Sequence, residues 1–280
     1  MFSTQSCFGV AGLLILVLLV APVGFALEFH VAPTGDDGQS GTVEAPFATL
    51  QRAQSAVREV VGAGLAEDVL VHVHEGTYFL EGPLCFGPED SGTEQHQVRY
   101  VAESKKPVLI SGGRPISGWT AAGDNRWAVT LPEVASGDWK FRQLFVDGER
   151  LTRGRFPNSP ELMQVKEVSE DLRTIVLETS PGIKDFSGMD AELVMFQNWS
   201  ISRVGIVSSS DTSLTLKNPM GWVGHGNATS ASPHKPAYIE NALAFVDATG
   251  EWYLDEASGV LTYQAAAGED PNTRNFIAPV

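Results

Sequence analysis

Short apolar segments separated by turn residues recur in the first part of the chain, and their spacing constrains the fold more than any other feature. The segment Val69–His74 alternates apolar and other side chains, as a half-buried strand does. A second such segment begins at Val98, 27 residues after Val71. Solenoid repeats take about 20–29 residues, and a coil of three short parallel strands falls in that range. The spacing therefore predicts parallel strands stacked as successive coils.

One amphipathic helix is predicted in this region, over residues 49–61. Thr49 is a residue type that caps helix N-termini, and Gly62 and Gly64 are typical of a helix end. The apolar positions follow spacings of three and four and are Leu50, Ala53, Val57 and Val61. The first coil of a solenoid exposes a row of unpaired backbone groups, which invites aggregation unless it is covered. We expect the helix to cover that edge.

Beyond residue 116 the strands are joined by tight turns. Asp147-Gly148 follows an apolar segment and is a hairpin signal. The segments 251–254 and 261–263 flank a turn and predict a second hairpin. Because hairpin strands pair antiparallel, this region is predicted to form an antiparallel insertion that resembles a sandwich or a barrel.

The predicted fold class is therefore all-β, with helix-capped parallel β-helix coils that carry an antiparallel insertion; the resemblance described below implies that the β-helix is right-handed. The predicted segments are a signal peptide at 1–26, the cap and first β-helix coils at 27–116, the insertion at 117–275 and a return toward the β-helix at 276–280. The 28 glycines and 16 prolines agree with the many turns of such a fold.

The first 26 residues predict export. Val10–Val20 is an almost unbroken apolar run, and Gly24–Ala26 offers small residues before a cleavage site. The run is shorter than the roughly 20 residues that a spanning helix needs, but the lack of Lys and Arg before it leaves an uncleaved anchor as the alternative. We expect cleavage and a secreted or periplasmic protein. Cys7 would leave with the signal, and Cys85 is expected to be buried.

The charge of the chain excludes some partners. Lys and Arg number 19 against 34 Asp and Glu, which gives a formal net charge of -15. Double-stranded nucleic acid and anionic membranes both attract basic proteins. We therefore expect no nucleic-acid partner and no membrane partner after signal cleavage, and a polysaccharide or oligosaccharide remains open. The oligomeric state is not predicted.

Several segments resemble right-handed parallel β-helix proteins of the pectate-lyase-like superfamily. The segments that carry the resemblance to the superfamily are Phe29–Asp37, Gly41-Thr42, Pro46–Ala53 and Glu75–Tyr78. Three later segments resemble a subgroup, the β-helix glycoside hydrolases with fucosidase or xylanase activity. These are Gln143–Arg150, Arg153–Asn158 and Gly250–Asp255. Only the N-terminal portion of such a protein is similar to this chain.

The resemblance implies a glycoside hydrolase in its full-length form. In the family, the catalytic carboxylates lie on coils that follow the region seen here, so they would follow Val280 and this chain would lack them. Glycoside hydrolysis generally uses two carboxyl groups, and the sequence alone pairs no two of the many acidic residues across a groove. The catalytic residues therefore stay unassigned.

Two tryptophans and a histidine are the first candidates for contact with a glycan. Trp199, Trp222 and His225 lie in glycine- and serine-rich loops, where aromatic faces can stack on sugar rings. The alternative is that both tryptophans anchor their loops to the core.

Arg155 is the other substrate-binding candidate. Together with Arg150 and Arg153 it can pair with a sugar carboxylate, as in glucuronate or galacturonate. The alternative is a set of structural ion pairs, which the many acidic residues favour.

No organic cofactor is expected. Asp36-Asp37 in a glycine-rich loop could bind calcium, although a local turn that these side chains stabilise is the favoured interpretation. His72 and His74 share one strand face, and we interpret them as strand residues rather than metal ligands because no third ligand is near in the sequence.

Two other functions stay open. A polysaccharide lyase on the same fold would cleave by elimination, often with calcium. A non-catalytic glycan-binding or surface protein would bind glycans without turnover. The sugar and its linkage are not predicted.

Overall fold

The computed structural model describes residues 26–103, 106–222 and 231–280. The chain divides after Ser111 into two compact units, called unit 1 (residues 26–111) and unit 2 (residues 112–280). The predicted signal peptide lies outside the described residues except for Ala26, and the domain boundaries predicted at 116 and 275 stay a prediction. Within the described ranges, no helix is both long and apolar enough to cross a membrane.

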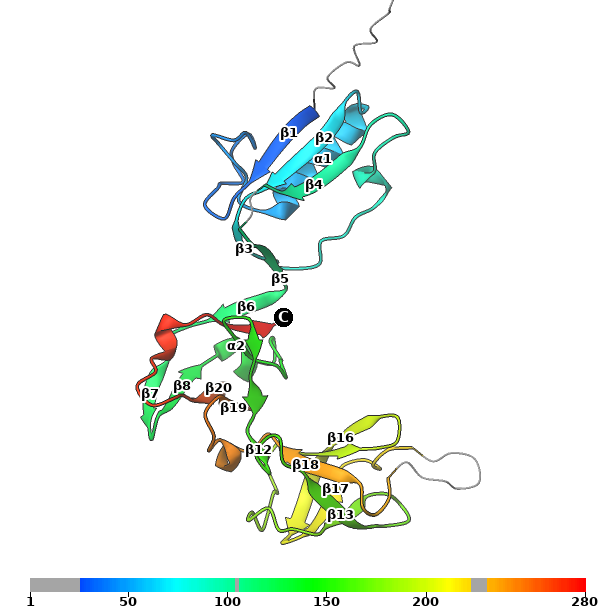
Figure 1. Cartoon of the computed structure of the whole chain (residues 1–280), viewed down its shortest axis with the longest axis vertical. Coiled ribbons are helices and arrows are strands. Elements are labelled where there is room, and N and C mark those ends of the chain that lie inside the picture. Colours follow the sequence, from blue (N-terminus) through cyan, green and yellow to red (C-terminus); the bar gives the residue numbers. More distant parts are fainter. Residues whose placement is uncertain (1–25, 104–105, 223–230) are drawn as a thin grey trace, which may run out of the picture. The chain divides into compact units, whose positions relative to one another are not determined.

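In its described residues, unit 1 contains two small parallel sheets, one α-helix and the short 3-10 helix Pro88–Asp90 (Figure 1). The strands are β1 (Ala26–Val31), β2 (Asp68–Val73), β3 (Gly76–Phe79), β4 (Val98–Ala102) and β5 (Val108–Ser111). The first sheet has the order β1-β2-β4, and the second pairs β3 with β5. Val69 lies opposite Val98, so the two segments whose spacing was noted in the sequence are neighbours in one sheet.

The helix α1 (Leu50–Ala63) begins and ends close to its predicted bounds. The Thr49 side chain accepts a hydrogen bond from the Arg52 backbone N–H and so caps the N-terminus of α1. Asp37 holds this cap in place, because its carboxylate accepts hydrogen bonds from the backbone N–H of Ala48 and from both the N–H and the hydroxyl of Thr49. Leu50, at 2% exposure, packs into the core of unit 1.

Asp36 and Asp37 thus stabilise the chain locally, as the turn interpretation expected. Asp36 accepts a hydrogen bond from the Gly38 N–H at 2.8 Å, and Asp37 is engaged by the start of the helix. Cys85 is exposed rather than buried. Its carbonyl accepts hydrogen bonds from Gln54 and Arg58, so the segment is held by its backbone and not by its thiol.

The predicted β-helix is corrected by the structure, since the described part of the chain contains no stack of parallel coils. Parallel pairing extends over β1-β2-β4 and β3-β5 and does not continue as coils beyond Ser111. A spacing of 27 residues can indicate that two strands are neighbours, but it cannot show that further strands join them, because those depend on partners later in the chain. The prediction of an all-β chain with few helices is confirmed.

Unit 2 contains two mixed or antiparallel sheets over one core. Their strands are β6 (Gly113–Ile116), β7 (Thr120–Gly123), β8 (Arg126–Thr130), β9 (Phe145–Val146), β10 (Glu149–Arg150), β11 (Thr152–Arg153), β19 (Glu251–Asp255), β20 (Val260–Gln264) and β21 (Phe276–Pro279). The orders are β10-β9-β21-β6 and β11-β19-β20-β8-β7. Trp252, Tyr263 and Phe276 are almost fully buried in the core. Both predicted hairpins, β9–β10 and β19–β20, are confirmed.

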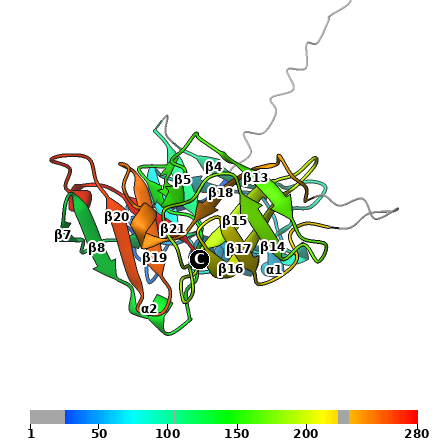
Figure 2. The same cartoon turned by 90° about the horizontal axis from the view of Figure 1, so that it is seen from below.

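Six further strands of unit 2 close into a barrel, which confirms that the later part of the chain contains an antiparallel barrel. They are β13 (Met163–Val168), β14 (Thr174–Leu177), β15 (Glu192–Phe196), β16 (Ile201–Ser210), β17 (Ser213–Leu216) and β18 (Pro236–Glu240), all labelled in Figure 2. Neighbouring strands pair antiparallel around the ring, and β15 pairs with β18 to close it. Leu193, Ile175 and Leu214 are fully buried inside. The short strand β12 (Arg155–Phe156) adds to β18.

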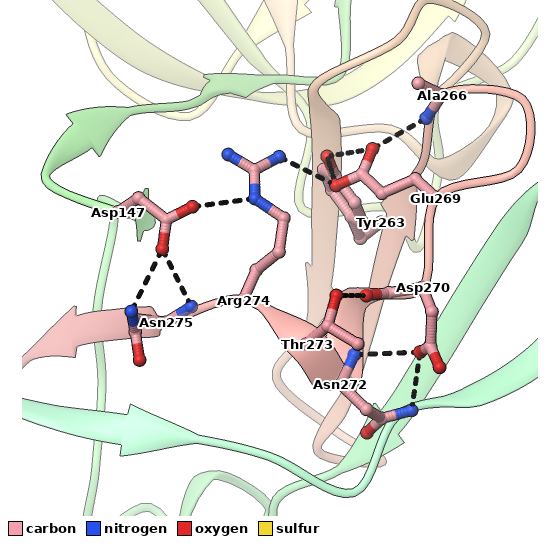
Figure 3. A network of polar contacts seen from close by, with 9 residues as sticks. All are labelled: Asp147, Tyr263, Ala266, Glu269, Asp270, Asn272, Thr273, Arg274 and Asn275. Atoms are coloured by element: carbon pink, nitrogen blue, oxygen red, sulfur yellow. Dashed lines mark hydrogen bonds and ion pairs between the residues drawn. The ribbon is translucent and has the colours of Figure 1, made fainter.

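Polar contacts tie the β9–β10 turn to the last strand of unit 2 (Figure 3). Asp147 accepts hydrogen bonds from the Arg274 guanidinium at 2.7 Å and from the Asn275 backbone N–H at 3.0 Å. Arg274 also donates to Glu269 at 2.9 Å, and Glu269 accepts from the Tyr263 hydroxyl at 3.1 Å. These hydrogen bonds, led by the Asn275 N–H, hold the pKa of Asp147 below its ordinary value. The turn is therefore fixed where it leads into β10.

Candidate functional site

A polar pocket of about 450 Å³ in unit 2 is lined by five arginines. One precedes β9, three lie on β10, β11 and β12, and one lies on the barrel strand β16. The arginines are Arg142, Arg150, Arg153, Arg155 and Arg203. Tyr238 and Glu240, which lie on β18, complete the barrel side of the lining. The predicted arginine cluster therefore does gather at one place, together with barrel residues that the sequence did not indicate.

Arg153 binds two carboxylates and has a structural role. Its guanidinium lies 3.0 Å from Glu192 and 3.3 Å from Glu240, and its side chain is 9% exposed. Arg203 also donates to Glu240, at 3.1 Å. Arg142 pairs with Glu192. For Arg153 the structure matches the ion-pair alternative, because both of its carboxylate partners belong to the barrel.

Arg155 is buried and is held by backbone carbonyls instead. It donates to the carbonyl oxygens of Pro157 and Glu161 at 2.8 and 2.5 Å. Its guanidinium lies 3.8 Å from the centre of the Tyr238 ring, a cation–π contact. Burial lowers the pKa of Arg155 below its ordinary value. Arg155 therefore adds positive charge to the pocket wall, while two of its five guanidinium donors are already used within the chain.

Arg150 differs from its neighbours, because it is exposed on β10. Within the described residues its guanidinium makes no hydrogen bond or ion pair. Its donors are thus available to a ligand in the pocket. A free guanidinium can form two parallel hydrogen bonds to a carboxylate, which makes Arg150 the clearest ligand contact of the five.

The charge of the pocket is opposite to that of the chain. Its lining holds five arginines and Glu240, and Glu192 pairs with two of the arginines from beside it. Five positive charges against two negative ones leave three positive charges, in a chain whose net charge is -15. Concave surfaces lined by one sign of charge concentrate ions of the other sign. The pocket therefore suits an anion.

Trp199 and Trp222 come together on the barrel, although they are far apart in the sequence. Their rings are almost parallel, with an angle of 14° between the planes and 6.2 Å between the centroids. Trp199 is 84% exposed and Trp222 is 45% exposed, so neither is a buried anchor of its loop. The third residue of the prediction, His225, lies outside the described residues.

The spacing of the two tryptophans limits how a sugar could bind. Contacts between carbon atoms are best at about 3.5–4.0 Å. A sugar ring between two aromatic rings would need two such contacts, or about 7–8 Å, and 6.2 Å separates the ring centres. A sugar would therefore lie on an outer face of the pair, and the exposure of Trp199 favours its outer face.

Glu240 lines the pocket, Glu192 pairs with two of the lining arginines, and both glutamates are engaged by arginines. A glycosidase needs one carboxyl group that is protonated and able to donate to the leaving oxygen. Both carboxylates already accept hydrogen bonds from the Arg153 guanidinium of this chain. These two residues thus suit the support of the pocket better than acid catalysis. No local sequence pattern indicates these two residues, because they lie on different barrel strands, β15 and β18.

Comparison with known proteins gives one family and a few structures. The family model described as the GH141 insertion domain matches residues 124–265. A solved glycoside hydrolase is 25% identical over 91% of this chain and 46% of its own, with a TM-score of 0.76. XylC in complex with xylose is 17% identical over 91% of this chain and 32% of its own, with a TM-score of 0.39. The curated proteins contain no match.

These matches correct the resemblance to the pectate-lyase-like superfamily. The matching family is the GH141 insertion domain, and the similar solved structure is a glycoside hydrolase. The subgroup motifs in residues 143–158 and 250–255 lie within the matched region. The opening motifs lie before it. The chain spans less than half of the length of that glycoside hydrolase.

Proposed function

Because the chain belongs to the GH141 insertion domain family, we propose that it is part of a glycoside hydrolase and that unit 2 binds a polysaccharide carrying carboxylates. The observation that carries this proposal is the uncompensated positive charge of the arginine pocket. Arg150 would bind a uronate carboxylate by two parallel hydrogen bonds, and Arg155 would contribute its charge from the wall. The volume of about 450 Å³ lies in the range of ligand pockets.

The pair Trp199 and Trp222 would provide a second contact for the same glycan. Aromatic rings bind the apolar faces of sugars regardless of charge. The two contacts would therefore make different contributions. The arginine pocket would select for acidic sugars, and the aromatic pair would add affinity for any pyranose.

Cleavage would be carried out by carboxyl groups outside unit 2, by acid–base hydrolysis without an organic cofactor. The engagement of Glu192 and Glu240 by arginines supports this division. The glycoside hydrolase that the chain resembles is about twice as long as the part that is matched. Calcium is not required by this proposal, since Asp36 and Asp37 are used by their own loop and by α1.

The first experiment measures binding of oligosaccharides to the whole chain by calorimetry. Oligogalacturonates are compared with neutral xylo-oligosaccharides of equal length, at low and at high salt. We expect tighter binding of the acidic series, weakened by salt because the contact is electrostatic. Arg150→Gln should weaken binding of the acidic series at least about tenfold, since a charged hydrogen-bonded pair is worth about 1.5–3 kcal/mol.

Arg173→Gln is the matched control for that variant. Arg173 lies on the barrel surface, away from the pocket lining, and donates to the Lys217 carbonyl. The Arg173→Gln variant removes one positive charge, as Arg150→Gln does, but leaves the pocket lining unchanged. Equal weakening by both variants would reduce the effect to net charge, and equal binding of acidic and neutral oligosaccharides would contradict the pocket assignment.

A second experiment tests the aromatic pair. Trp199→Ala should weaken both the acidic and the neutral series, because stacking does not depend on charge. Stability should hardly change, since Trp199 is 84% exposed. Unchanged affinity for both series would remove the tryptophans from the binding surface.

The reaction itself is tested on the longer protein that carries this chain. A hydrolase releases a reducing end without ultraviolet absorbance, whereas a lyase leaves an unsaturated uronate that absorbs in the ultraviolet. Binding without either product would favour a non-catalytic glycan-binding protein. We also propose export to the periplasm or the medium, on the basis of the predicted signal at residues 1–26, and N-terminal sequencing of the exported protein would test it.

A further inference from the structure

Parallel pairing in unit 1 gathers histidines and glutamates on one face of its sheet. The valines of β2 are buried in the core, so the alternate residues, including His72, point to the opposite face. His30 on β1 lies opposite His72. His74 follows the end of β2, and Glu103 follows the end of β4. Folding therefore brings to His72 and His74 further possible ligands that are not their neighbours in the sequence.

The Nε2 atom of His74 lies close to two other groups. It is 3.0 Å from His30 Nδ1 and 2.9 Å from an oxygen of Glu103. All three ligand atoms lie within 4.8 Å of one another. The His30 side chain is 8% exposed, that of His74 is 28% exposed and that of Glu103 is 37% exposed. The cluster is thus buried at one end and open to solvent at the other.

Hydrogen bonding alone satisfies this arrangement poorly. A ring nitrogen either carries one hydrogen or presents one lone pair. If His74 Nε2 donates its hydrogen to Glu103, no hydrogen is directed at His30 Nδ1. If it instead accepts from His30, no hydrogen lies between it and the carboxylate oxygen of Glu103. A cation between the three atoms would be attracted to all of them.

The distances and the ligand types fit a zinc ion. Zinc binds imidazole nitrogen and carboxylate oxygen at about 2.0–2.2 Å, so neighbouring ligand atoms lie about 3.0–3.5 Å apart. The two short distances, 2.9 and 3.0 Å, are close to this range. Two nitrogens and one carboxylate suit zinc, whereas calcium and magnesium prefer oxygen ligands. We propose that His30, His74 and Glu103 bind one zinc ion, with water as the fourth ligand.

A neighbouring set fits less well. Glu28 lies 4.0 Å from His30 Nε2 and 3.8 Å from His72 Nε2, and that atom of His72 is buried without a hydrogen-bond partner among the described residues. The rings of His30 and His72 are stacked, however, with 4.6 Å between centroids and 8° between planes. Lone pairs in the planes of stacked rings run side by side and do not converge on one ion. We therefore assign the ion to the His74 side.

Zinc at this position would join the ends of three strands. Its ligands come from β1, from the residue after β2 and from the residue after β4. An ion that binds the folded state and not the unfolded chain raises the melting temperature. The site would thus stabilise unit 1, and it is independent of the glycan site proposed for unit 2.

The test is a titration of the untagged, metal-free chain with zinc chloride, by calorimetry and by competition with a chromogenic chelator. The variants are His30→Gln, His74→Gln and Glu103→Gln. The control is His234→Gln, because His234 is 83% exposed and pairs with Glu178 at 3.7 Å, with no third ligand beside them among the described residues. Circular dichroism and scanning calorimetry confirm that each variant is folded. Glu103→Gln is nearly isosteric and partly exposed, so it is the variant that best preserves the fold.

We expect one zinc ion per chain and a zinc-dependent rise in the melting temperature. Each of the three ligand variants should weaken binding at least about tenfold, while His234→Gln and His72→Gln should leave it unchanged. Absence of binding by the wild type, or equal affinity of the wild type and the three variants, would overturn the proposal. Loss of binding in His72→Gln but not in His74→Gln would overturn the choice of ligands.

Discussion

Replacement of Arg153 by methionine should destabilise unit 2 strongly. Arg153 donates to Glu192 at 3.0 Å and to Glu240 at 3.3 Å, and its side chain is 9% exposed. The two glutamates are opposite each other on β15 and β18. Methionine keeps the stem of the side chain but removes the positive charge between them. Like charges that lie opposite each other on paired strands repel.

The expected loss is about 3 kcal/mol of unfolding free energy. A hydrogen bond to a charged group contributes about 1.5–3 kcal/mol, and Arg153 makes two. Glu192 keeps Arg142 and Glu240 keeps Arg203, so the loss should not reach the roughly 5 kcal/mol upper limit for a buried charge left alone. For a unit of this size, 1 kcal/mol lowers the melting temperature by about 2–4 °C. The expected decrease is thus about 6–12 °C.

Tryptophan fluorescence measures this effect selectively. All six tryptophans lie at or after Trp119 and therefore in unit 2. Thermal unfolding followed at this signal is compared for the wild type, Arg153→Met and the control Arg150→Met, which removes an exposed charge without a partner. The control should stay within about 0.5 kcal/mol of the wild type. If Arg153→Met also did so, the ion pairs would contribute nothing and the reasoning would be refuted.

Glu251→Gln should match or raise the stability at neutral pH. Glu251 is 3% exposed and burial raises its pKa. Its contribution to stability is therefore complete below about pH 4.5 and is lost as pH rises through its pKa in the folded state. The melting temperatures of the wild type and the variant, measured from pH 4 to 8, should converge toward low pH, and a difference that stays constant with pH would contradict this. Asp37→Ala should cost about 2 kcal/mol, because the Thr49 cap loses its acceptor, and urea unfolding followed by far-ultraviolet circular dichroism checks it. Asp147→Asn should cost about 1 kcal/mol through loss of the charged contact to Arg274, reduced by its partial exposure; an unchanged melting temperature by fluorescence would refute a role in fixing the turn.

Features of the fold with local causes could be predicted from the sequence. The helix α1 follows from the Thr49 cap and the spacing of its apolar residues. The hairpin β19–β20 follows from its turn, and the β9–β10 hairpin from Asp147-Gly148, which adopt the positive φ angles of 48° and 89° that this dipeptide favours. Closure of the barrel could not be predicted, because β15 and β18 are joined by a long stretch that contains β16 and β17.

The candidate sites show the same limit. The cluster of arginines was visible in the sequence, but the roles of its members were not, because Arg153 and Arg150 differ only in what the folded chain brings near them. The contact between Trp199 and Trp222 depends on folding of the barrel. His30 was missed as a partner of His74 because the parallel pairing of β1 with β2 brings them together.

The pairing of β15 with β18 determines where the barrel can be cut from the chain as a separate fragment. Glu192 and Glu240 stand face to face where the ring closes, and Arg153, which separates their charges, belongs to β11 in a different sheet. A fragment that began after β12 would contain every strand of the ring, and Arg203 on β16 would still pair with Glu240, but it would lack Arg153, the buried arginine that contacts both glutamates. A fragment that keeps the barrel intact therefore begins before Arg153. Its N-terminal limit is set by this ion pair and not by the order of the strands.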